Sequence, residues 1–324
     1  MSDPGALIRQ FQGKRVVVFG DLVADVFVYG EIARVSREAP VLVLNHRETQ
    51  LVPGGAANAI HNLRMLGAKP IPVGLVGDDD EGRALLRFFQ DLDIDTRRIK
   101  VLKGYRTPTK MRIQAGAVHS QRQQIVRLDS GGPLGDDKAR RDIEERLQKA
   151  LKKADALLVS DYGYDLVRPE AIQGLGSSSI PVTIDSRFSF LNYSGLTAAT
   201  PNEPEVEAAL GISIGNDLEK LEAAGRKLMR QLKHKALLIT RGKDGMALFE
   251  RGKKTTHIPI HGTDEIADVT GAGDTVIATF TLALAAGGSF VDAAMLANLA
   301  GGIVVMKYGT RPVSLAELEA AVKP

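Results

Sequence analysis

The chain has 324 residues, of which 44% are hydrophobic, so it can bury a large core. Its 42 basic and 39 acidic residues leave a net charge of +3, which gives no indication of a nucleic-acid or membrane surface. Cysteine is absent, which excludes a disulfide framework and thiolate metal sites.

The predicted elements begin with Arg15-Val-Val-Val-Phe-Gly-Asp21, a β-branched run typical of a buried strand and its exit turn. Similar runs follow at 70–76, 99–102, 156–161, 180–185 and 236–240. Helical patterns end near residue 67 and cover 81–92, 137–151, 275–287, 290–308 and 315–322. This alternation predicts an α/β fold with a mostly parallel sheet that is covered on both faces.

Two β-rich blocks, at about 30–51 and 105–130, interrupt the alternation and predict a small separate sheet within a single domain spanning 1–324. Lys110, Arg112 and Arg127 occupy alternating positions in the second block. Such residues usually form a solvated strand face, but they also suit the oxygens of a phosphate group.

Three acids, Asp21, Asp25 and Asp161, follow predicted strands. Ligands bind at the carboxyl ends of strands in open α/β sheets, so these acids are candidate ligand-binding residues. The alternative is that they stabilise turns, which is the favoured interpretation for Asp21.

The motif Pro53-Gly-Gly-Ala-Ala-Asn58 precedes a helical pattern. Gly54 and Gly55 would allow a sugar to lie against the backbone, and Asn58 offers a donor and an acceptor to vicinal hydroxyls. The alternative is a tight turn whose small residues serve helix packing.

Two further motifs lie downstream. In Thr200-Pro-Asn-Glu-Pro-Glu205, Asn202 and Glu205 have the spacing of a helix capping box. The strand at 236–240 leads into a glycine-flanked loop that contains Gly242 and Gly245.

The motif Asp268-Val-Thr-Gly-Ala-Gly-Asp274 is a glycine-rich turn that opens a helix. The amides of Gly271, Ala272 and Gly273 would point out of the helix start, where they suit an anion such as phosphate. Asp274, beside them, could remove a proton from a hydroxyl that attacks a phosphoryl group. The alternative is an ordinary helix start with an acid in its first turn.

The last motif resembles the C-terminal signature of the PfkB (ribokinase-like) carbohydrate kinases, and Pro53–Asn58 and Asn202-Glu-Pro-Glu205 resemble its other two motifs in the right order. The resemblance implies a three-layer α/β/α fold with a small β-sheet lid, and ATP and Mg²⁺ as cofactors. No other phosphate loop, dinucleotide fingerprint or His-Glu-x-x-His zinc motif is present.

The resemblance also implies residue roles. Asp25 and Asp161 would contact sugar hydroxyls, and Asn202 and Glu205 would organise water, Mg²⁺ and the nucleotide phosphates. Thr240 and Gly242 would contact the nucleotide phosphates and ribose, and Asn298 would lie beside the adenine. Asp268 and Thr270 would lie near a monovalent cation such as K⁺, as in ribokinase.

Within the family, the chain is most similar to the D-glycero-β-D-manno-heptose-7-phosphate kinase branch. The stretches that carry this similarity include Gly20-Asp-Leu-Val-Ala-Asp25, Ser36-Arg-Glu-Ala-Pro-Val41, Thr109-Lys-Met-Arg112, Ile125-Val-Arg-Leu-Asp129, Ser160-Asp-Tyr162 and Lys307-Tyr-Gly-Thr310. The chain departs from the branch at Tyr164 and at Asp185-Ser-Arg187, where that branch has a lysine and Asp-Pro-Lys. Arg187 is positioned in sequence to compensate for a lost lysine.

We therefore expect a kinase for a heptose-7-phosphate. The alternatives are a ribokinase-like, fructokinase-like or nucleoside kinase and, outside catalysis, a sugar-binding sensor. The expected partners are the sugar or sugar phosphate, ATP and a second copy of the chain bound through the lid. No segment resembles a secretory signal or reaches the ~20 apolar residues of a membrane span, so we expect a cytoplasmic protein.

Overall fold

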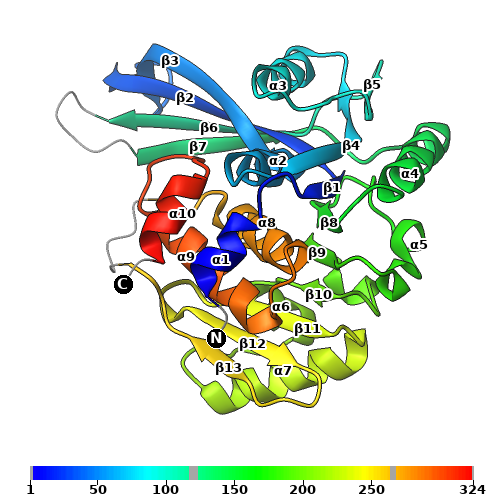
Figure 1. Ribbon diagram of the computed structural model, residues 1–324. Coiled ribbons are helices and arrows are strands. Elements are labelled where there is room, and N and C mark those ends of the chain that lie inside the picture. Colours follow the sequence, from blue (N-terminus) through cyan, green and yellow to red (C-terminus); the bar gives the residue numbers. More distant parts are fainter. Residues whose placement is uncertain (1–2, 117–122, 263–267, 323–324) are drawn as a thin grey trace.

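The computed structural model describes residues 3–116, 123–262 and 268–322. Within these ranges the strands form one sheet of nine strands and one of four, and helices cover both faces of the larger sheet (Figure 1). No helix in these ranges has the length and apolar character needed to cross a bilayer.

The larger sheet has the strand order β13-β12-β11-β10-β9-β8-β1-β4-β5. Strands β11 to β5 pair in parallel, and β12 and β13 add an antiparallel edge. The strands are β1 (Arg15–Gly20), β4 (Lys69–Gly77), β5 (Ile99–Leu102), β8 (Ala156–Asp161), β9 (Val182–Ser186), β10 (Ala198–Ala199), β11 (Ala236–Thr240), β12 (Met246–Glu250) and β13 (Thr256–Ile258).

The apolar core lies on both faces of this sheet. In β1, Val16 and Val18 belong to one buried cluster, whereas Val17 and Phe19 belong to the other. Successive side chains of a strand point to opposite faces, so a strand buried on both faces needs a continuous apolar run. The predicted α/β/α architecture is confirmed.

Two groups of helices supply the outer layers. Those contributing to the first cluster are α1 (Pro4–Arg9), α2 (Ala56–Met65), α3 (Asp80–Asp91), α8 (Ala272–Ala285), α9 (Phe290–Val305) and α10 (Leu315–Ala321). Those contributing to the second are α4 (Asp137–Leu151), α5 (Pro169–Ile172), α6 (Glu203–Leu210) and α7 (Leu218–Leu232). Short 3₁₀ turns lie at η1 (Leu175–Ser177), η2 (Phe190–Asn192) and η3 (Gly242–Asp244).

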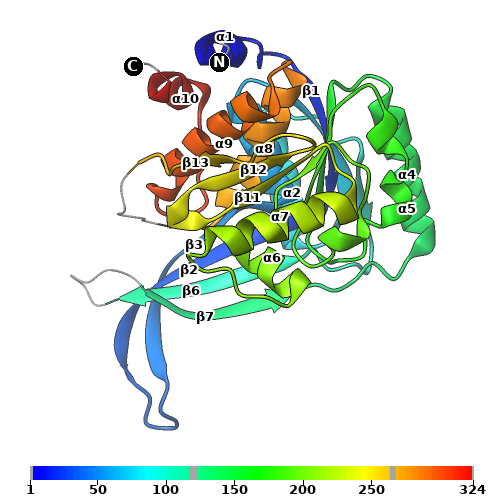
Figure 2. The same ribbon diagram turned by 90° about the horizontal axis from the view of Figure 1, so that it is seen from below.

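The four-stranded sheet, called the small sheet below, has the order β3-β2-β6-β7. Its strands are β2 (Leu22–Val35), β3 (Leu42–Gly55), β6 (Thr109–Gly116) and β7 (Gln123–Ser130). Strands β2 and β6 are parallel, and the other two pairs are antiparallel. Figure 2 shows the β2–β3 hairpin extending well beyond the body of the molecule.

The small sheet begins earlier in the chain than the expected block at about 30–51. Residues 22–27 are buried and pair with residues 50–55, so the strand starts directly after the exit of β1. Asp25, Gly54 and Gly55 therefore lie in the small sheet itself. The second expected block, 105–130, contains β6 and β7, and its residues 117–122 lie outside the described ranges.

Candidate active site

The candidate site lies where the carboxyl ends of β1, β8 and β9 meet the small sheet and the first turns of α2 and α8. Gly271 precedes α8 with φ at 78°, in the left-handed region. A Cβ added at Gly271 would lie 2.5 Å from Nδ2 of Asn58. The start of α8 can therefore approach α2 this closely only with glycine at position 271.

Asp274 lies in the first turn of α8 and is 3% exposed. Its Oδ2 accepts a hydrogen bond from Nδ2 of Asn58 at 2.9 Å, and its Oδ1 accepts one from the hydroxyl of Tyr162 at 2.8 Å. Burial raises the pKa of Asp274 to about 6, against the lowering effect of these two hydrogen bonds and of Lys110. A carboxyl group with this pKa is ionised at neutral pH and is suited to accept a proton.

The three backbone amides at this turn are not equivalent. The N–H of Ala272 donates to the carbonyl oxygen of Val269 at 3.2 Å, so it is engaged inside the turn rather than pointing out of it. A Cβ added at Gly273 would meet no heavy atom within 4 Å, so open space adjoins the backbone there. The expected outward direction of all three amides is thus wrong for Ala272.

Asn58, which the sequence predicts to bind sugar hydroxyls, lies beside Asp274, but its amide group bonds to other protein groups. Besides Asp274, its Nδ2 reaches the carbonyl oxygen of Gly271 at 3.3 Å, and its Oδ1 accepts from Nδ2 of Asn62 at 3.1 Å. In this structure Asn58 therefore orients Asp274 and joins α2 to α8.

On the small-sheet side, Asp25 is 5% exposed and forms an ion pair with Arg112, in which Nη1 lies 2.6 Å from Oδ1. A Cβ added at Gly54 would lie 2.6 Å from Oδ2 of the same carboxylate. Gly54 is thus needed for the position of Asp25. The structure brings Asp25, Gly54 and Arg112 together.

Lys110, on β6 next to Asp25 on β2, lies over the ring of Tyr162, with its Nζ 4.4 Å from the ring centroid. Burial and the nearby charge of Arg187 lower the pKa of Lys110, while Asp25 and Asp274 raise it. Lys110 therefore belongs to the same cluster of charges as Asp274.

Asp21 and Asp161 bond to protein groups. Oδ2 of Asp21 accepts the N–H groups of Tyr162 and Tyr164 at 2.8 and 3.3 Å, and burial with the charge of Asp161 raises its pKa to about 7. Asp161 accepts hydrogen bonds from the N–H of Gly163 and from the hydroxyls of Ser186 and Tyr193. These contacts favour the turn-stabilising alternative for both acids.

Two other candidates contribute less directly. Gly55 has φ at 55°, and a Cβ there would lie 3.2 Å from Cδ2 of Tyr162, so this glycine makes room for that ring. Arg127 pairs with the exposed Asp129 on its own strand at 2.8 Å, and 42% of its side chain is exposed. The structure does not bring Arg127 into contact with Asp274 or Asp25.

A pocket of about 550 Å³ opens beside the start of α8. It is lined by the predicted nucleotide residues Asn202, Thr240, Gly242, Gly245 and Asn298, together with Ala272 and Gly273 of the helix start. Met246, Ile260, Val276 and Val305 supply apolar walls. An apolar slot with a few polar groups and this volume fits a nucleotide.

Asn202 and Glu205 form the predicted capping box at the start of α6, with bonds of 2.9 and 2.8 Å. Burial raises the pKa of Glu205, and burial together with the charge of Glu205 raises that of Asp185. The charge of Arg187 opposes both shifts, and the two carboxylates offer oxygen donors of the kind that Mg²⁺ prefers. This donor set fits the expected magnesium ion.

Asp268 and Thr270 are joined by a bond from the N–H of Thr270 to Oδ1 of Asp268 at 2.9 Å. Oδ2 of Asp268 accepts the N–H of Gly309 at 3.2 Å. The adjoining Val269 lines the nucleotide-sized pocket, so this loop borders the pocket.

The sequence motifs indicate neither Tyr162 nor Asp185 as a site residue, and Arg187 is expected there only as a replacement for a lost lysine. Asp185 ends a strand in the same way as Asp161, and that pattern was a usable signal. Tyr162 lies in a stretch that carries the similarity to the heptose-phosphate kinase branch, but its contact with Asp274, 112 residues away, has no local signal.

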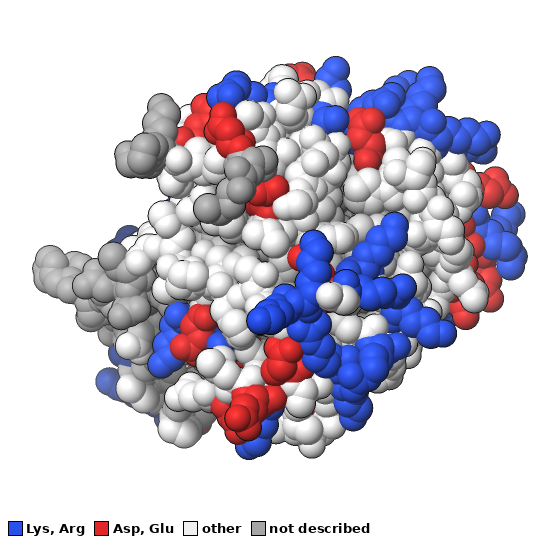
Figure 3. All heavy atoms as spheres, turned by 60° about the horizontal axis from the view of Figure 1, so that its bottom comes forward, with Lys and Arg blue, Asp and Glu red and all other residues white. Residues whose placement is uncertain are grey.

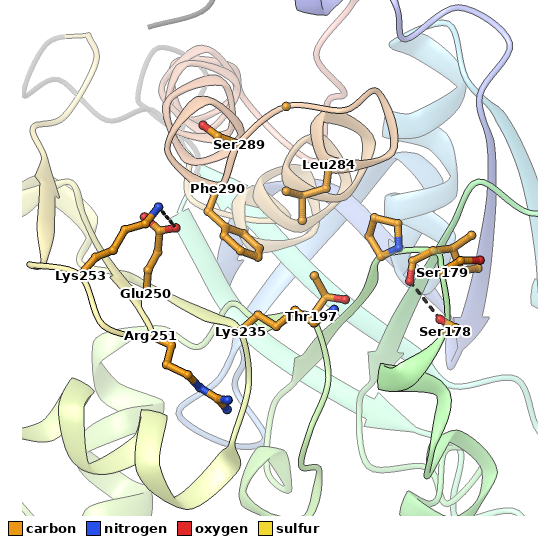
Figure 4. A pocket seen from close by; sticks show the side chains of 13 residues that line it. Ser178, Ser179, Thr197, Lys235, Glu250, Arg251, Lys253, Leu284, Ser289 and Phe290 are labelled. Carbon is orange, nitrogen blue, oxygen red and sulfur yellow. Dashed lines mark hydrogen bonds and ion pairs between the residues drawn. The ribbon is translucent and has the colours of Figure 1, made fainter.

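A second pocket of about 550 Å³ lies at the amino ends of β9, β10 and β11, on the side of the large sheet opposite the candidate site. In Figure 4, Leu284 and Phe290 face Thr197 and Lys235 across it. None of the predicted site residues lines it.

Basic side chains gather in a band across the face shown in Figure 3, although the net charge is small.

Comparisons with known proteins agree with this geometry. The profile described as "pfkB family carbohydrate kinase" matches residues 14–317. The proteins called "Bifunctional protein HldE" from Coxiella burnetii and Geobacter sulfurreducens are 38% and 40% identical, over 97% and 93% of this chain. The chain spans only 65% and 61% of the length of these two relatives.

Solved structures share the fold. Arabidopsis thaliana ribokinase complexed with ribose and ATP aligns with a TM-score of 0.74 and 20% identity, over 96% of this chain and 99% of that one. Phosphofructokinase-2 from Escherichia coli in complex with substrates and products aligns with a TM-score of 0.75 and 16% identity, over 95% and 98%. The chain belongs to the pfkB family of carbohydrate kinases and is an ATP-dependent kinase of that family.

Proposed function

We propose that this protein transfers the γ-phosphoryl group of ATP to a hydroxyl of a phosphorylated sugar, a heptose-7-phosphate that is phosphorylated at position 1. One observation carries the proposal: the start of α8 borders both candidate binding regions. Asp274 faces the small-sheet residues, whereas Ala272 and Gly273 line the nucleotide-sized pocket. Both reactants can therefore meet at one helix start.

In the proposed reaction, Asp274 accepts the proton of the sugar hydroxyl as the sugar oxygen forms a bond to the γ-phosphorus. The bond between that phosphorus and the β,γ-bridging oxygen breaks, and ADP leaves. The amides of Gly271 and Gly273 and the dipole of α8 would stabilise negative charge on the transferring group.

Sugar kinases of this family use Mg²⁺ with ATP. Glu205, with Asp185 beside it, would hold the ion directly or through water. When bound, Mg²⁺ neutralises part of the charge on the nucleotide phosphates. We also propose the loop of Asp268 and Thr270 as the place of a monovalent cation such as K⁺.

Two cations support a phosphorylated rather than a neutral sugar. Lys110 of the small sheet and Arg187, just after β9, are close enough for the charge of Arg187 to lower the pKa of Lys110. Within the described residues, neither forms an ion pair with an acid; each lies over an aromatic ring instead. Two cations that repel one another are stabilised by an anionic ligand between them.

A substrate panel with a coupled ADP assay tests the proposal. The panel contains heptose-7-phosphate, unphosphorylated heptose, ribose, fructose, fructose-6-phosphate and a nucleoside. We expect heptose-7-phosphate to have the highest kcat/KM, on the order of 100-fold above the unphosphorylated heptose, because two charge-assisted contacts are lost with the phosphate. A higher kcat/KM for a neutral sugar would contradict the proposed substrate class.

The two cations can be tested in the same assay. Arg187→Ala and Lys110→Ala should each raise KM for the sugar phosphate about tenfold or more and leave KM for ATP nearly unchanged. Arg127→Ala is the matched control, because Arg127 pairs with Asp129 outside the cluster. Equal effects of Arg127→Ala and Arg187→Ala would remove the support that these cations give to a phosphorylated substrate.

A further inference from the structure

We propose that Tyr162 is a positioning residue that fixes the carboxylate of Asp274 and keeps it in the ionised form needed for proton abstraction. The proposal rests on the proposed function, in which Asp274 is the base. Neither the motifs of the chain nor its similarities assign Tyr162 a role. The hydrogen bonds around Asp274 carry the inference.

Tyr162 is itself held from three directions. Its backbone N–H donates to Oδ2 of Asp21 at 2.8 Å, which fixes the turn after β8. Its ring lies against Gly55, where an added Cβ would come within 3.2 Å of Cδ2. The Nζ of Lys110 covers the ring at 4.4 Å from the centroid. The hydroxyl is therefore presented to Asp274 by a side chain with little freedom to rotate.

The donors are divided evenly between the two carboxylate oxygens. Tyr162 donates to Oδ1 at 2.8 Å, and Asn58 donates to Oδ2 at 2.9 Å. A carboxylate oxygen can accept two hydrogen bonds, so each oxygen retains room for a substrate hydroxyl. The arrangement orients the base without blocking it.

Toward the ionised carboxylate of Asp274, the hydroxyl of Tyr162 acts as the donor. Burial and the charge of Asp274 raise the pKa of Tyr162 well above its ordinary value, so the phenol keeps its proton. A donor stabilises the ionised form of a carboxyl group more than the neutral form. Tyr162 therefore opposes the burial that raises the pKa of Asp274.

Other charges also face Asp274, and they do not make Tyr162 redundant. Lys110 on β6 favours the ionised carboxylate, whereas Asp25 on β2 disfavours it. Asp185 on β9 is close enough for the charge of Asp274 to raise its own pKa, so it too disfavours ionisation of Asp274. Arg112 pairs with Asp25, and the charge of Arg187 lowers the pKa of Asp185, so each of these acids has a cation of its own nearby. The neutral donors Tyr162 and Asn58 bond directly to the carboxylate of Asp274 and favour its ionised form.

The test compares pH profiles of kcat/KM for Tyr162→Phe, the wild type and a matched control. Tyr193→Phe is the control, because Tyr193 also donates to a buried carboxylate, that of Asp161, at 2.8 Å. We expect the acid limb of the Tyr162→Phe profile to move upward by about one pH unit, which is a roughly fivefold loss of kcat/KM at pH 6 and almost no loss at pH 8. Tyr193→Phe should lower the melting temperature but leave the acid limb in place.

An acid limb at the same pH in Tyr162→Phe and the wild type would overturn the proposal, whatever the absolute rate. So would an equal displacement in Tyr193→Phe, because that would indicate a general structural effect.

A direct titration separates this inference from the proposed reaction. The protein is labelled with ¹³C at the aspartate carboxyl carbons, and the signal of Asp274 is assigned by its absence in Asp274→Asn. We expect Asp274 to titrate about one pH unit higher in Tyr162→Phe than in the wild type, without any substrate present. An unchanged titration would overturn the inference even if the protein phosphorylates sugars. A shifted titration in a protein that releases no ADP would instead reject the proposed function alone.

Discussion

At the residue scale, the carboxylate of Asp274 depends on donors from distant parts of the chain. Asn58 and Tyr162 lie 216 and 112 residues away from it. Each donor packs against a glycine at which a side chain would crowd it: Asn58 against Gly271, and Tyr162 against Gly55. The environment of Asp274 is therefore set by neighbours whose importance no local pattern reveals.

Asp274→Asn should reduce kcat on the order of 100-fold or more and leave the affinity for ATP nearly unchanged, because an amide cannot accept the proton of the sugar hydroxyl. The coupled ADP assay gives kcat, and calorimetric titration with ATP gives the dissociation constant. Asp129→Asn, which changes an exposed carboxylate on β7, is the control. Near-normal turnover of Asp274→Asn would reject the role of this residue as base.

The buried Asp21 predicts a dependence of stability on pH. Its pKa is raised to about 7 in the folded protein, whereas an unfolded aspartate titrates near ~3.9. The folded state then binds more protons between these values, so this residue's contribution to stability is lost as pH rises through that window.

Asp21→Asn keeps an acceptor for the N–H of Tyr162 and removes the charge. Relative to the wild type, its free energy of unfolding should rise by on the order of 1 kcal/mol or more between pH 5 and pH 8. Urea unfolding at both pH values measures this difference. If the free energy of unfolding changed equally with pH in Asp21→Asn and in the wild type, Asp21 would not be the titrating group.

At the element scale, helix α8 is the part on which both halves of the site depend. Its first turn holds Asp274 and lines the nucleotide-sized pocket, and its body packs in the core between β8, β9 and α9. The two glycines flanking Ala272 serve different purposes. Gly271 has a left-handed backbone and no room for a Cβ, whereas Gly273 has neither restriction.

These two glycines allow a matched pair of variants. Gly271→Ala should lower the melting temperature and kcat together, because it adds about 1 kcal/mol or more of backbone strain and displaces Asn58. Gly273→Ala should leave the melting temperature nearly unchanged and raise KM for ATP several-fold, because its methyl group would enter the nucleotide-sized pocket. Thermal unfolding and ATP kinetics of both variants provide the comparison, and similar behaviour of the two would contradict this assignment.

Much of the element pattern could be predicted from sequence because the apolar runs and caps are local. Strand β8 and helix α4 were expected at their observed bounds, and the capping box of Asn202 and Glu205 was expected as such. The family and the α/β/α fold are confirmed, while the roles of the individual site residues stay predictions.

The small sheet begins at Leu22 rather than near residue 30, because a single residue, Asp21, joins β1 to β2 where the sequence indicates only an exit turn. The pairing of Asp25 with Arg112 could not be predicted, because it depends on the parallel register of β2 and β6 across 87 residues. Local patterns predict elements, whereas contacts between sheets depend on tertiary packing.

At the scale of the whole molecule, the small sheet projects from the body (Figure 2). Several of its apolar side chains are exposed. They include Ile32, Val35, Leu42, Ile125, Val126 and Leu128, with Leu128 53% exposed. Val126 and Leu128 point to the same face of β7, and an exposed apolar face of this kind is typical of an association site. We therefore propose that two copies of the chain associate through the small sheet.

The double variant Val126→Lys, Leu128→Lys should then be monomeric, because buried ammonium groups would oppose association. Size-exclusion chromatography with light scattering measures the mass at micromolar concentration. Val101→Lys on β5, a site 50% exposed in the large sheet, is the control and should leave the mass unchanged. A monomeric wild type, or a double variant that still forms dimers, would contradict association through this sheet.

The junction between the two sheets has a mechanical consequence. Asp21 is the one residue between the end of β1 and the start of β2, so the core continues into the small sheet without a flexible linker. Strand β3 likewise passes directly into α2, so a rotation of the small sheet would change backbone torsion angles at Asp21 and at the Gly55–Ala56 junction. Because the side chain of Asp21 also anchors the turn of Tyr162, a rotation of the small sheet would shift the phenol that donates to Asp274. A movement of the small sheet would thereby also change the orientation of the carboxylate that accepts the proton.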